Sequence, residues 1–308
     1  MARTWCALLL SSLLGFAGAT ATTAGAAVPP DQPTPEQSAA PTATPDPSAK
    51  PPAGIVPTTA TLAQVLALYR ASEGKATSDF KTYRETDTIA AFGETGTYSE
   101  IDSGDDYIET TQLGPSRTSG GSYHGQRWRQ NGNGYTRLVS GIHEEEEHSS
   151  DALARSIRGE NLASVKLLGE VASPVHAYIV EVNPEQGRHE WLFIDVATGR
   201  LVRTEESRVG HRVVWTYDDF RTTDGIVTPW HQHLFDGFAG NDVDWRITQL
   251  AYGMPVAASD VAIPPTKSPL RFPSGVTRVR LPARIEDGVI IVRLVINGRG
   301  LDFQLDSG

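Results

Sequence analysis

Beyond residue 80 the sequence is divided into short segments in which apolar and polar residues alternate, and this pattern restricts the chain to a sheet-based fold. Gly, Ser, Asn and Asp separate the segments, which are residues 80–88, 95–100, 106–112, 121–130, 134–139, 176–182, 189–195, 201–207, 211–220, 228–235 and 243–252. Short strands with turn residues at regular intervals are typical of antiparallel sheets, because parallel strands need long crossover connections. We therefore predict one antiparallel domain over residues 61–265.

Two segments have helical rather than strand periodicity. Thr61 and Gln64 match a capping box, and apolar residues follow at helical spacing until Gly74, a common residue just beyond a helix. In residues 150–158, Leu153 and Ile157 are four positions apart and predict a second short helix. The expected fold class is mainly β, with two short helices that cover one face of the antiparallel sheet.

The N-terminal residues 1–26 are typical of a secretory signal peptide. Arg3 is the only charge, an apolar core covers residues 7–17, and small residues at 24–26 offer a cleavage site. The apolar run is too short for a membrane span of about 20 residues. Residues 27–60 are rich in Pro, Ala and Thr, and this composition predicts a disordered linker. We expect an exported protein, periplasmic or extracellular.

Composition excludes several functional classes. Cys6 is the only cysteine and precedes the apolar core of the signal peptide, so the exported protein would contain neither a disulfide nor a reactive thiol. The formal net charge is −10 and no basic tract is present, which disfavours nucleic acid as a partner. The sequence has no Walker loop, G-x-S-x-G or H-E-x-x-H motif, and we expect no cofactor.

A pair of histidines raises the question of a metal site. His231 and His233 are two positions apart on a predicted strand, so both imidazoles lie on one face and could chelate a metal ion. No third ligand occurs at a matching spacing, and the interpretation we favour is two polar residues on a solvent-facing strand. Residues 143–148 place four glutamates between two further histidines. A charged run of this kind is typical of a solvated loop.

Residues 285–308 predict a β-hairpin that ends in an acidic loop. Apolar residues alternate on both sides of Asn297-Gly298; they are Val292, Leu294, Ile296, Leu301, Phe303 and Leu305. An Asn-Gly pair between two alternating segments is the strongest short-range signal of a hairpin turn. The returning strand leads directly into Asp306-Ser307-Gly308.

Residues 289–308 resemble the N-terminal hairpin of the retropepsin-like aspartyl protease family, in its valine-rich strand, N-G-x-G turn and L-D-[ST]-G loop. The resemblance implies that Asp306 is the catalytic aspartate, that the Ser307 hydroxyl holds the paired loops together, and that Gly308 is the loop glycine. In such enzymes two aspartates share one proton. Asp102-Ser103-Gly104 repeats the three letters without the hairpin, and we interpret it as a solvated turn.

This resemblance leads to the first functional hypothesis. The complete protein would be an exported aspartic endopeptidase that acts on a polypeptide substrate. One such loop per domain implies a homodimer through the protease domain. No flap and no second catalytic loop follow Asp306, so the present chain would be inactive alone, either as a fragment of a longer protein or because the protease has been lost.

Residues 177–201 and 217–229 resemble the LolA/LolB-like outer-membrane lipoprotein carriers, through the runs I-D-V-A-T-G-R-L and D-F-R-T-T-D-G-I-V-T-P. The resemblance implies a half-barrel-like antiparallel sheet that curls around a helix and holds an acyl chain. It supports the alternative hypothesis, a periplasmic lipid- or lipoprotein-binding module without catalysis; a structural envelope protein is a third. Residues 195–199 fit a hairpin turn, and residues 266–284 would connect this domain to the C-terminal hairpin.

Overall fold

The computed structural model describes residues 50–75, 80–139, 142–160, 162–185, 187–208, 211–238, 240–266, 275, 280–286 and 289–305. These residues fall into two units, the larger covering residues 50–266 and the smaller covering the described residues from 275 to 305. The predicted signal peptide and residues 306–308 lie outside the described residues.

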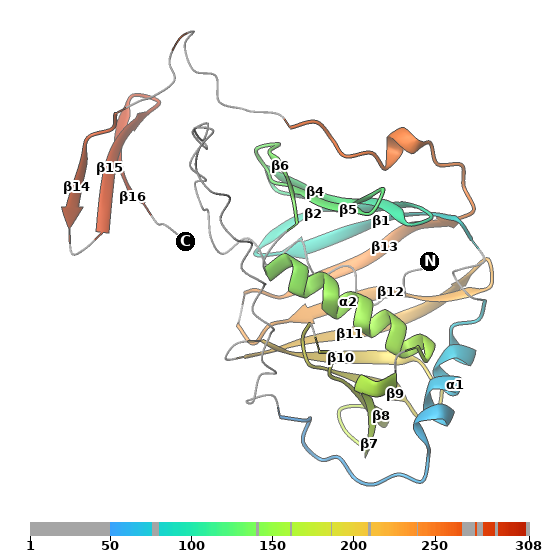
Figure 1. Ribbon diagram of the computed structural model, residues 1–308. Coiled ribbons are helices and arrows are strands. Elements are labelled where there is room, and N and C mark those ends of the chain that lie inside the picture. The colour runs from blue at the N-terminus through green and yellow to red at the C-terminus, as the bar shows by residue number, and fades with distance from the viewer. Residues whose placement is uncertain are drawn as a thin grey trace, which may run out of the picture. The chain divides into compact units, whose positions relative to one another are not determined.

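The larger unit is built on one antiparallel sheet of thirteen strands in the order β6-β5-β4-β3-β2-β1-β13-β12-β11-β10-β9-β8-β7 (Figure 1). Every neighbouring pair except β1–β13 is consecutive in the chain, so the first and last strands meet in the middle of the sheet. The strands are β1 Thr82–Ala91, β2 Glu94–Ser103, β3 Asp106–Leu113, β4 Ser116–Tyr123, β5 Gln126–Gln130, β6 Thr136–Leu138, β7 Val165–Val171, β8 Ala177–Val182, β9 Glu190–Asp195, β10 Leu201–Arg208, β11 His211–Thr223, β12 Ile226–Phe235 and β13 Val243–Tyr252.

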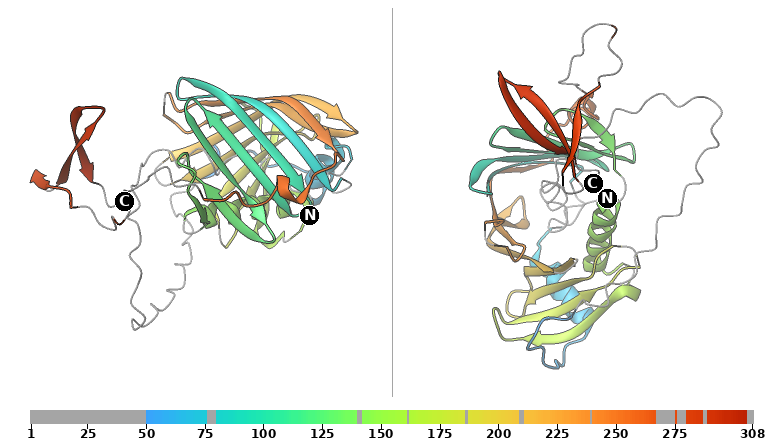
Figure 2. Two further views of the ribbon diagram at one scale, coloured as in Figure 1. Left: turned by 90° about the horizontal axis from the view of Figure 1, so that it is seen from above. Right: turned by 90° about the vertical axis from the view of Figure 1, so that its left-hand side faces the viewer.

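The sheet bends around the long helix α2 (Ile142–Arg158), so that its edge strands β6 and β7 lie on opposite sides of that helix (Figures 1 and 2). The Ser149 hydroxyl of α2 accepts a hydrogen bond from the backbone N–H of Arg188, just before β9, at 2.6 Å. We call the face of the sheet that α2 covers the inner face, and the opposite face the outer face. The expected fold class, mainly β with two helices and a curled antiparallel sheet, is confirmed.

The first helix, α1 (Leu62–Ser72), forms where the capping box predicted it. The backbone N–H of Gln64 donates to the Thr61 hydroxyl at 3.3 Å, and the Gln64 side chain accepts from the backbone N–H of Thr61 at 2.8 Å. Gly74 follows the helix with φ of +77°, and a Cβ there would lie 2.3 Å from the carbonyl oxygen of Gly225. Only glycine satisfies both conditions, so this residue ends α1 and ties it to the β11–β12 turn.

The second helix corrects one sequence prediction. Residues 143–148 were expected to form a solvated loop, but α2 begins at Ile142 and includes them. Glutamate has a high helix propensity, and residues 152–157 supply buried positions that anchor the helix, among them Leu153 and Ile157. The short helix predicted over residues 150–158 is the C-terminal half of this longer one. Two 3₁₀ turns complete the unit: Leu162–Ser164 and Ala258–Asp260.

In the larger unit, the strands β4 and β7 were not predicted, and the strand predicted over residues 121–130 had the wrong bounds. Residues 121–130 were expected to be a single strand, but they contain the end of β4, a turn and β5. The strand β4 is rich in Ser and Gly, residues that favour turns in sequence-based reasoning. The strand β7 has Gly169 in its interior, where a Cβ would lie 2.2 Å from the carbonyl oxygen of Val56. That close approach of a second backbone explains a glycine that breaks the strand pattern.

The smaller unit contains the predicted hairpin. The strands β15 (Val289–Ile296) and β16 (Arg299–Leu305) pair in antiparallel register from Ile290↔Leu305 to Ile296↔Arg299. Asn297 and Gly298 both have positive φ, of 51° and 78°, as a two-residue type I′ turn requires. A third strand that was not predicted, β14 (Ala283–Glu286), pairs with β15. Among the described residues, no helix is long and apolar enough to cross a membrane.

Candidate functional site

The inner face of the larger unit is mostly apolar across β8 to β13, although Glu190, Thr204, Glu206 and Gln232 are also buried on it. Side chains that alternate onto this face are almost fully buried and come from β8, β9, β11, β12, β13 and the adjoining end of β1; they include Val180, Leu192, Ile194, Val213, Trp215, Leu234, Val243, Trp245 and Ile89. From α1, Val65, Leu66 and Tyr69 are buried as well. Burial on this scale is what anchors helices to the sheet.

A stripe of aromatic rings runs across this apolar region. Trp215 and Trp245 stack with their ring centroids 5.0 Å apart, and Tyr217 stacks on Trp215 at 6.5 Å. The indole N–H groups of Trp215 and Trp245 are buried, yet no described residue offers either of them an acceptor. Buried indole N–H groups usually find a hydrogen-bond partner. The indole N–H groups of Trp128, Trp191 and Trp230 also have no acceptor among the described residues, so what distinguishes Trp215 and Trp245 is that the two rings stack on each other.

The inner face changes character at β1. Glu85, Asp87, Glu100 and Glu109 are buried on β1, β2 and β3, with exposed fractions of 3%, 1%, 6% and 4%. Glu85 is opposite Glu100 and Glu100 is opposite Glu109, so three carboxyl groups form a line across three strands. We call these four residues the carboxylate row. Acidic side chains are rarely buried to this extent without a partner.

Tyrosines are placed beside the carboxylate row. Each precedes a glutamate by two residues on its own strand and therefore points to the same face. Tyr83 donates a short hydrogen bond to Glu85, and Tyr98 donates to Glu100 at 2.8 Å while lying 3.5 Å from Glu109. Burial raises the pKa of both phenols well above the ordinary value, and the neighbouring carboxylates raise it further. Both hydroxyls therefore remain protonated and act as donors.

The line of residues continues across β4 and β5 through a glycine to an arginine. Glu109 is opposite Gly120 on β4, and Gly120 is opposite Arg129 on β5. A Cβ at position 120 would lie 2.9 Å from Oε1 of Glu109, so any larger residue would displace that carboxyl group. Gly120 thus gives the Glu109 side chain the space it occupies.

Within the carboxylate row, Glu85 and Asp87 lie close to each other and both have raised pKa values. Burial raises the pKa of Glu85 well above its ordinary value, and the nearby carboxyl groups of Asp87 and Glu100 raise it further. Burial also raises the pKa of Asp87, to about 7, although a hydrogen bond with Glu85 lowers it. Apart from a proton shared with Glu85, neither Asp87 oxygen accepts a hydrogen bond from a described residue.

Sequence reasoning missed this site, although the sequence carries a signal for it. The three strands share a Tyr-x-Glu spacing, at Tyr83-Arg84-Glu85, Tyr98-Ser99-Glu100 and Tyr107-Ile108-Glu109. A repeat of tyrosine and glutamate on one face of successive strands could have been noticed. Acidic residues in a strand are ordinarily assigned to its solvent-facing side, because charged residues usually face water.

The same register corrects the interpretation of Asp102-Ser103-Gly104. Gly104, with φ of +70°, does lie in the β2–β3 turn. Asp102 does not: it belongs to β2 and is opposite Tyr83 on β1 and Tyr107 on β3. It therefore shares the inner face with the carboxylate row, and only the following residues form the turn.

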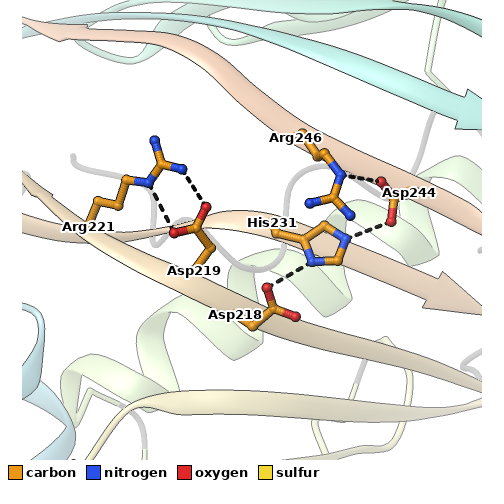
Figure 3. A network of polar contacts seen from close by, with 6 residues as sticks. All are labelled: Asp218, Asp219, Arg221, His231, Asp244 and Arg246. Atoms are coloured by element: carbon orange, nitrogen blue, oxygen red, sulfur yellow. Dashed lines mark hydrogen bonds and ion pairs between the residues drawn. The ribbon is translucent and has the colours of Figure 1, made fainter.

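The histidine pair lies on the outer face of β12. His231 is held between two aspartates, with Nδ1 2.8 Å from Asp218 and Nε2 2.6 Å from Asp244 (Figure 3). Arg246 also contacts Asp244, at 3.1 Å. His233 lies 3.8 Å from Asp242 and is partly exposed. No cluster of three or more potential metal ligands with suitable geometry occurs among the described residues.

Two other predicted features have definite outcomes. The 195–199 segment forms the expected β9–β10 turn, in which the backbone N–H of Thr198 donates to the Asp195 carboxylate at 2.7 Å. The hairpin that would deliver Asp306 is present, but Asp306, Ser307 and Gly308 lie outside the described residues. Their catalytic role remains a prediction.

Comparisons with known proteins give a partial likeness of fold. No protein-family model matches the chain, and no curated protein matches its sequence. Among solved structures, a DUF1329 family protein from Desulfovibrio piger has a TM-score of 0.47 and 15% identity, over 66% of this chain and 98% of that one. A putative outer membrane lipoprotein-sorting protein domain from Vibrio parahaemolyticus has a TM-score of 0.45 and 11% identity, over 65% and 97%.

A LolA superfamily protein from Nitrosomonas europaea has a TM-score of 0.45 and 14% identity, covering 67% of this chain and 99% of that one. Likeness at this level does not carry a functional assignment. The resemblance of residues 289–308 to retropepsin-like proteases rests on those residues alone.

Proposed function

We propose that residues 50–266 form an exported ligand-binding domain that holds the acyl chain of a lipid or of a lipid-modified protein on its inner face. The observation that carries the proposal is the pair of stacked indoles of Trp215 and Trp245. Both are buried in an apolar face, and both have an N–H group without an acceptor among the described residues. An ester or carboxyl oxygen at the end of an acyl chain would supply that acceptor.

The surroundings of these indoles suit an alkyl chain. The inner face from β8 to β13 presents many aliphatic and aromatic side chains, with the buried amide of Gln232 opposite both Tyr217 and Trp245, and the sheet is bent around α2. Apolar surfaces with a few polar groups at defined positions are the usual lining of lipid and small-molecule sites. The names of two of the similar structures, a lipoprotein-sorting protein domain and a LolA superfamily protein, point in the same direction.

The proposal is tested by titrating the full chain with cis-parinaric acid, a polyene fatty acid whose emission is excited by energy transfer from tryptophan. We expect saturable binding that unlabelled fatty acid displaces. Trp215→Phe and Trp245→Phe should each weaken binding, because they keep an aromatic side chain, although a smaller one, and remove the N–H donor. Trp128→Phe is the matched control, because Trp128 is equally buried but lies on the outer face of β5. Absence of saturable binding to the folded protein would rule the proposal out.

The aspartic endopeptidase hypothesis remains a second candidate for a protein that contains further protease segments. The observation in its favour is the β15–β16 hairpin, whose returning strand ends at Leu305, directly before Asp306. In such a protein, peptide hydrolysis at mildly acidic pH should disappear in Asp306→Asn and persist in Asp102→Asn. Hydrolysis that survives Asp306→Asn would exclude this candidate.

A further inference from the structure

The boundary between the apolar face and the carboxylate row lies within one strand. On β1, Asp87 precedes Ile89 by two residues, so both side chains point to the inner face. Ile89 is opposite Trp245 on β13, and Asp87 is opposite Ile247. Asp87 is therefore a diagonal cross-strand neighbour of Trp245, close enough for one ligand to contact both. The aromatic stripe ends at an acidic group.

Asp87 is the member of the carboxylate row whose hydrogen-bonding needs are least met. Tyr83 supplies a donor to Glu85, and Tyr98 supplies one to Glu100. The described residues supply Asp87 with no comparable donor, and none of their arginine, lysine or histidine side chains forms an ion pair with it or with Glu85. Its exposed fraction is only 1%, so water does not compensate. A fully buried carboxyl group whose one described hydrogen-bond partner is another carboxyl group is a rare feature that calls for a functional explanation.

Two chemical states of Asp87 would remove the cost of burying its charge without a partner. The carboxyl group can take up a proton, or it can pair with a cation that enters the site. Asp87 has a raised pKa that still lies near neutrality, so the charged form remains accessible to a cation. The neighbouring Glu85, whose pKa burial raises well above its ordinary value, adds a second carboxyl group that can accept a hydrogen bond, and the indole face of Trp245 adds favourable cation–π character. An ammonium group that loses its water in this site would pair with Asp87, donate a hydrogen bond to Glu85 and lie against the indole of Trp245.

We propose that Asp87 and Glu85 select ligands that carry a cationic amine at the end of an apolar chain. The chain would lie along Trp245, Trp215 and the aliphatic side chains of β9 to β12, and the ammonium group would donate hydrogen bonds to Asp87. This inference rests on the proposed function, since it names the head group of the ligand that the apolar face would hold. It also explains why one face of one sheet combines such different residues.

The test compares three ligands with the same alkyl chain on the full chain at neutral pH: dodecylamine, dodecanol and dodecanoate. Each is titrated below its micelle concentration by isothermal calorimetry. We expect dodecylamine to bind at least about tenfold more tightly than dodecanol, since close charge pairs in desolvated sites commonly contribute this much. Dodecanoate should bind more weakly than dodecylamine, because its carboxylate can accept from the indole N–H groups but cannot pair with Asp87.

Asp87→Asn tests the residue itself. It keeps the shape of the side chain and removes the charge, so the preference for dodecylamine over dodecanol should fall to within about twofold while dodecanol binding is retained. Glu85→Gln is a second variant and should reduce the preference by a smaller factor. The matched control is Asp242→Asn, an exposed acid beside His233, which should leave all three affinities unchanged.

The outcomes separate the two proposals. If none of the three ligands binds to the folded protein, the proposed function falls and this inference falls with it. If all three bind equally, or if Asp87→Asn keeps the amine preference, the apolar site stands and the inference about its head group is wrong. The ligand panel alone decides the question if a variant fails to fold. Calcium binding that disappears in Asp87→Asn, without amine selectivity, would identify a metal site instead.

Discussion

The two parts of the inner face are equally buried but differ in chemistry. Trp215 and Asp87 both have exposed fractions of 1%, although one lies in the apolar part and the other in the carboxylate row. Burying the indole is favourable in proportion to the apolar area removed from water, whereas burying an unpaired carboxyl group is unfavourable. The apolar part therefore stabilises the fold, and the carboxylate row is maintained at a cost to stability. Features that reduce stability and persist are where function is expected.

The largest predicted effect concerns the apolar part. Trp215→Ala should reduce the free energy of unfolding by about 3–5 kcal/mol, because it removes a fully buried aromatic ring and leaves a cavity. Chemical denaturation followed by circular dichroism measures the change. Phe238→Ala provides the control: Phe238 is 57% exposed, and its loss should change stability by less than about 0.5 kcal/mol. Equal effects of the two substitutions would contradict the assignment of Trp215 to the core.

The carboxylate row should respond in the opposite direction. The folded-state pKa of Asp87 is about 7, above its ordinary value of 3.8. The folded protein therefore holds a proton that the unfolded chain loses, and stability falls as the pH rises from about 4 to about 7. At about pH 8, Asp87→Asn should stabilise the ligand-free protein by about 2–4 kcal/mol. At about pH 4 the same substitution should have little effect.

Thermal unfolding at both pH values checks this prediction. A stabilisation that is the same at both pH values would show that Asp87 is not protonated on folding. A loss of stability at the higher pH would show that the carboxylate has a cationic partner in the protein itself, and it would remove the contrast between the two parts of the inner face.

A smaller effect is expected at the junction of the two parts. Trp245→Phe should weaken binding of a fatty-acyl probe by about fivefold, the contribution of one neutral hydrogen bond. It should also lower stability, because the smaller ring leaves a cavity in a buried position. Trp128→Phe on the outer face should leave probe affinity unchanged. A similar loss in both variants would point to a general change of packing rather than to a ligand contact.

The smallest effect is predicted for the exposed ion pair between Asp219 and Arg221 (Figure 3). Asp219→Asn should leave the unfolding midpoint within experimental error, because exposed ion pairs contribute little. A clear loss of stability there would show that acidic groups outside the inner face also contribute to the fold, and would weaken the distinction drawn above.

Strand periodicity predicted the architecture because successive side chains in each strand point to opposite faces of the sheet, which gives the sequence a regular alternation. The capping box at Thr61 and the Asn297-Gly298 turn are local signals, and both formed as predicted. The errors occurred where a tertiary contact overrides local preference. Gly169 lies in a strand because the backbone at Val56 approaches it, and the glutamates at the start of α2 are helical because the second half of that helix is buried.

The carboxylate row was missed for a physical reason. Alternation assigns residues to two faces of a strand but does not say which face is buried. For β1 the apolar residues Ile89 and Ala91 share their face with Glu85 and Asp87, so a rule that places acids in solvent contradicts itself within one strand. That contradiction, repeated as Tyr-x-Glu in β2 and β3, is a useful indication of a buried polar site.

The measurement that tests the account most directly is a crystal structure of the full chain with a terminally brominated dodecylamine. Anomalous scattering locates the bromine, and the electron density locates the amine. The account predicts bromine against the aliphatic side chains of β9 to β11 on the inner face, the alkyl chain along Trp215 and Trp245, and the amine within hydrogen-bonding distance of Asp87. Bromine on the outer face, or an amine that points away from the carboxylate row, would contradict it.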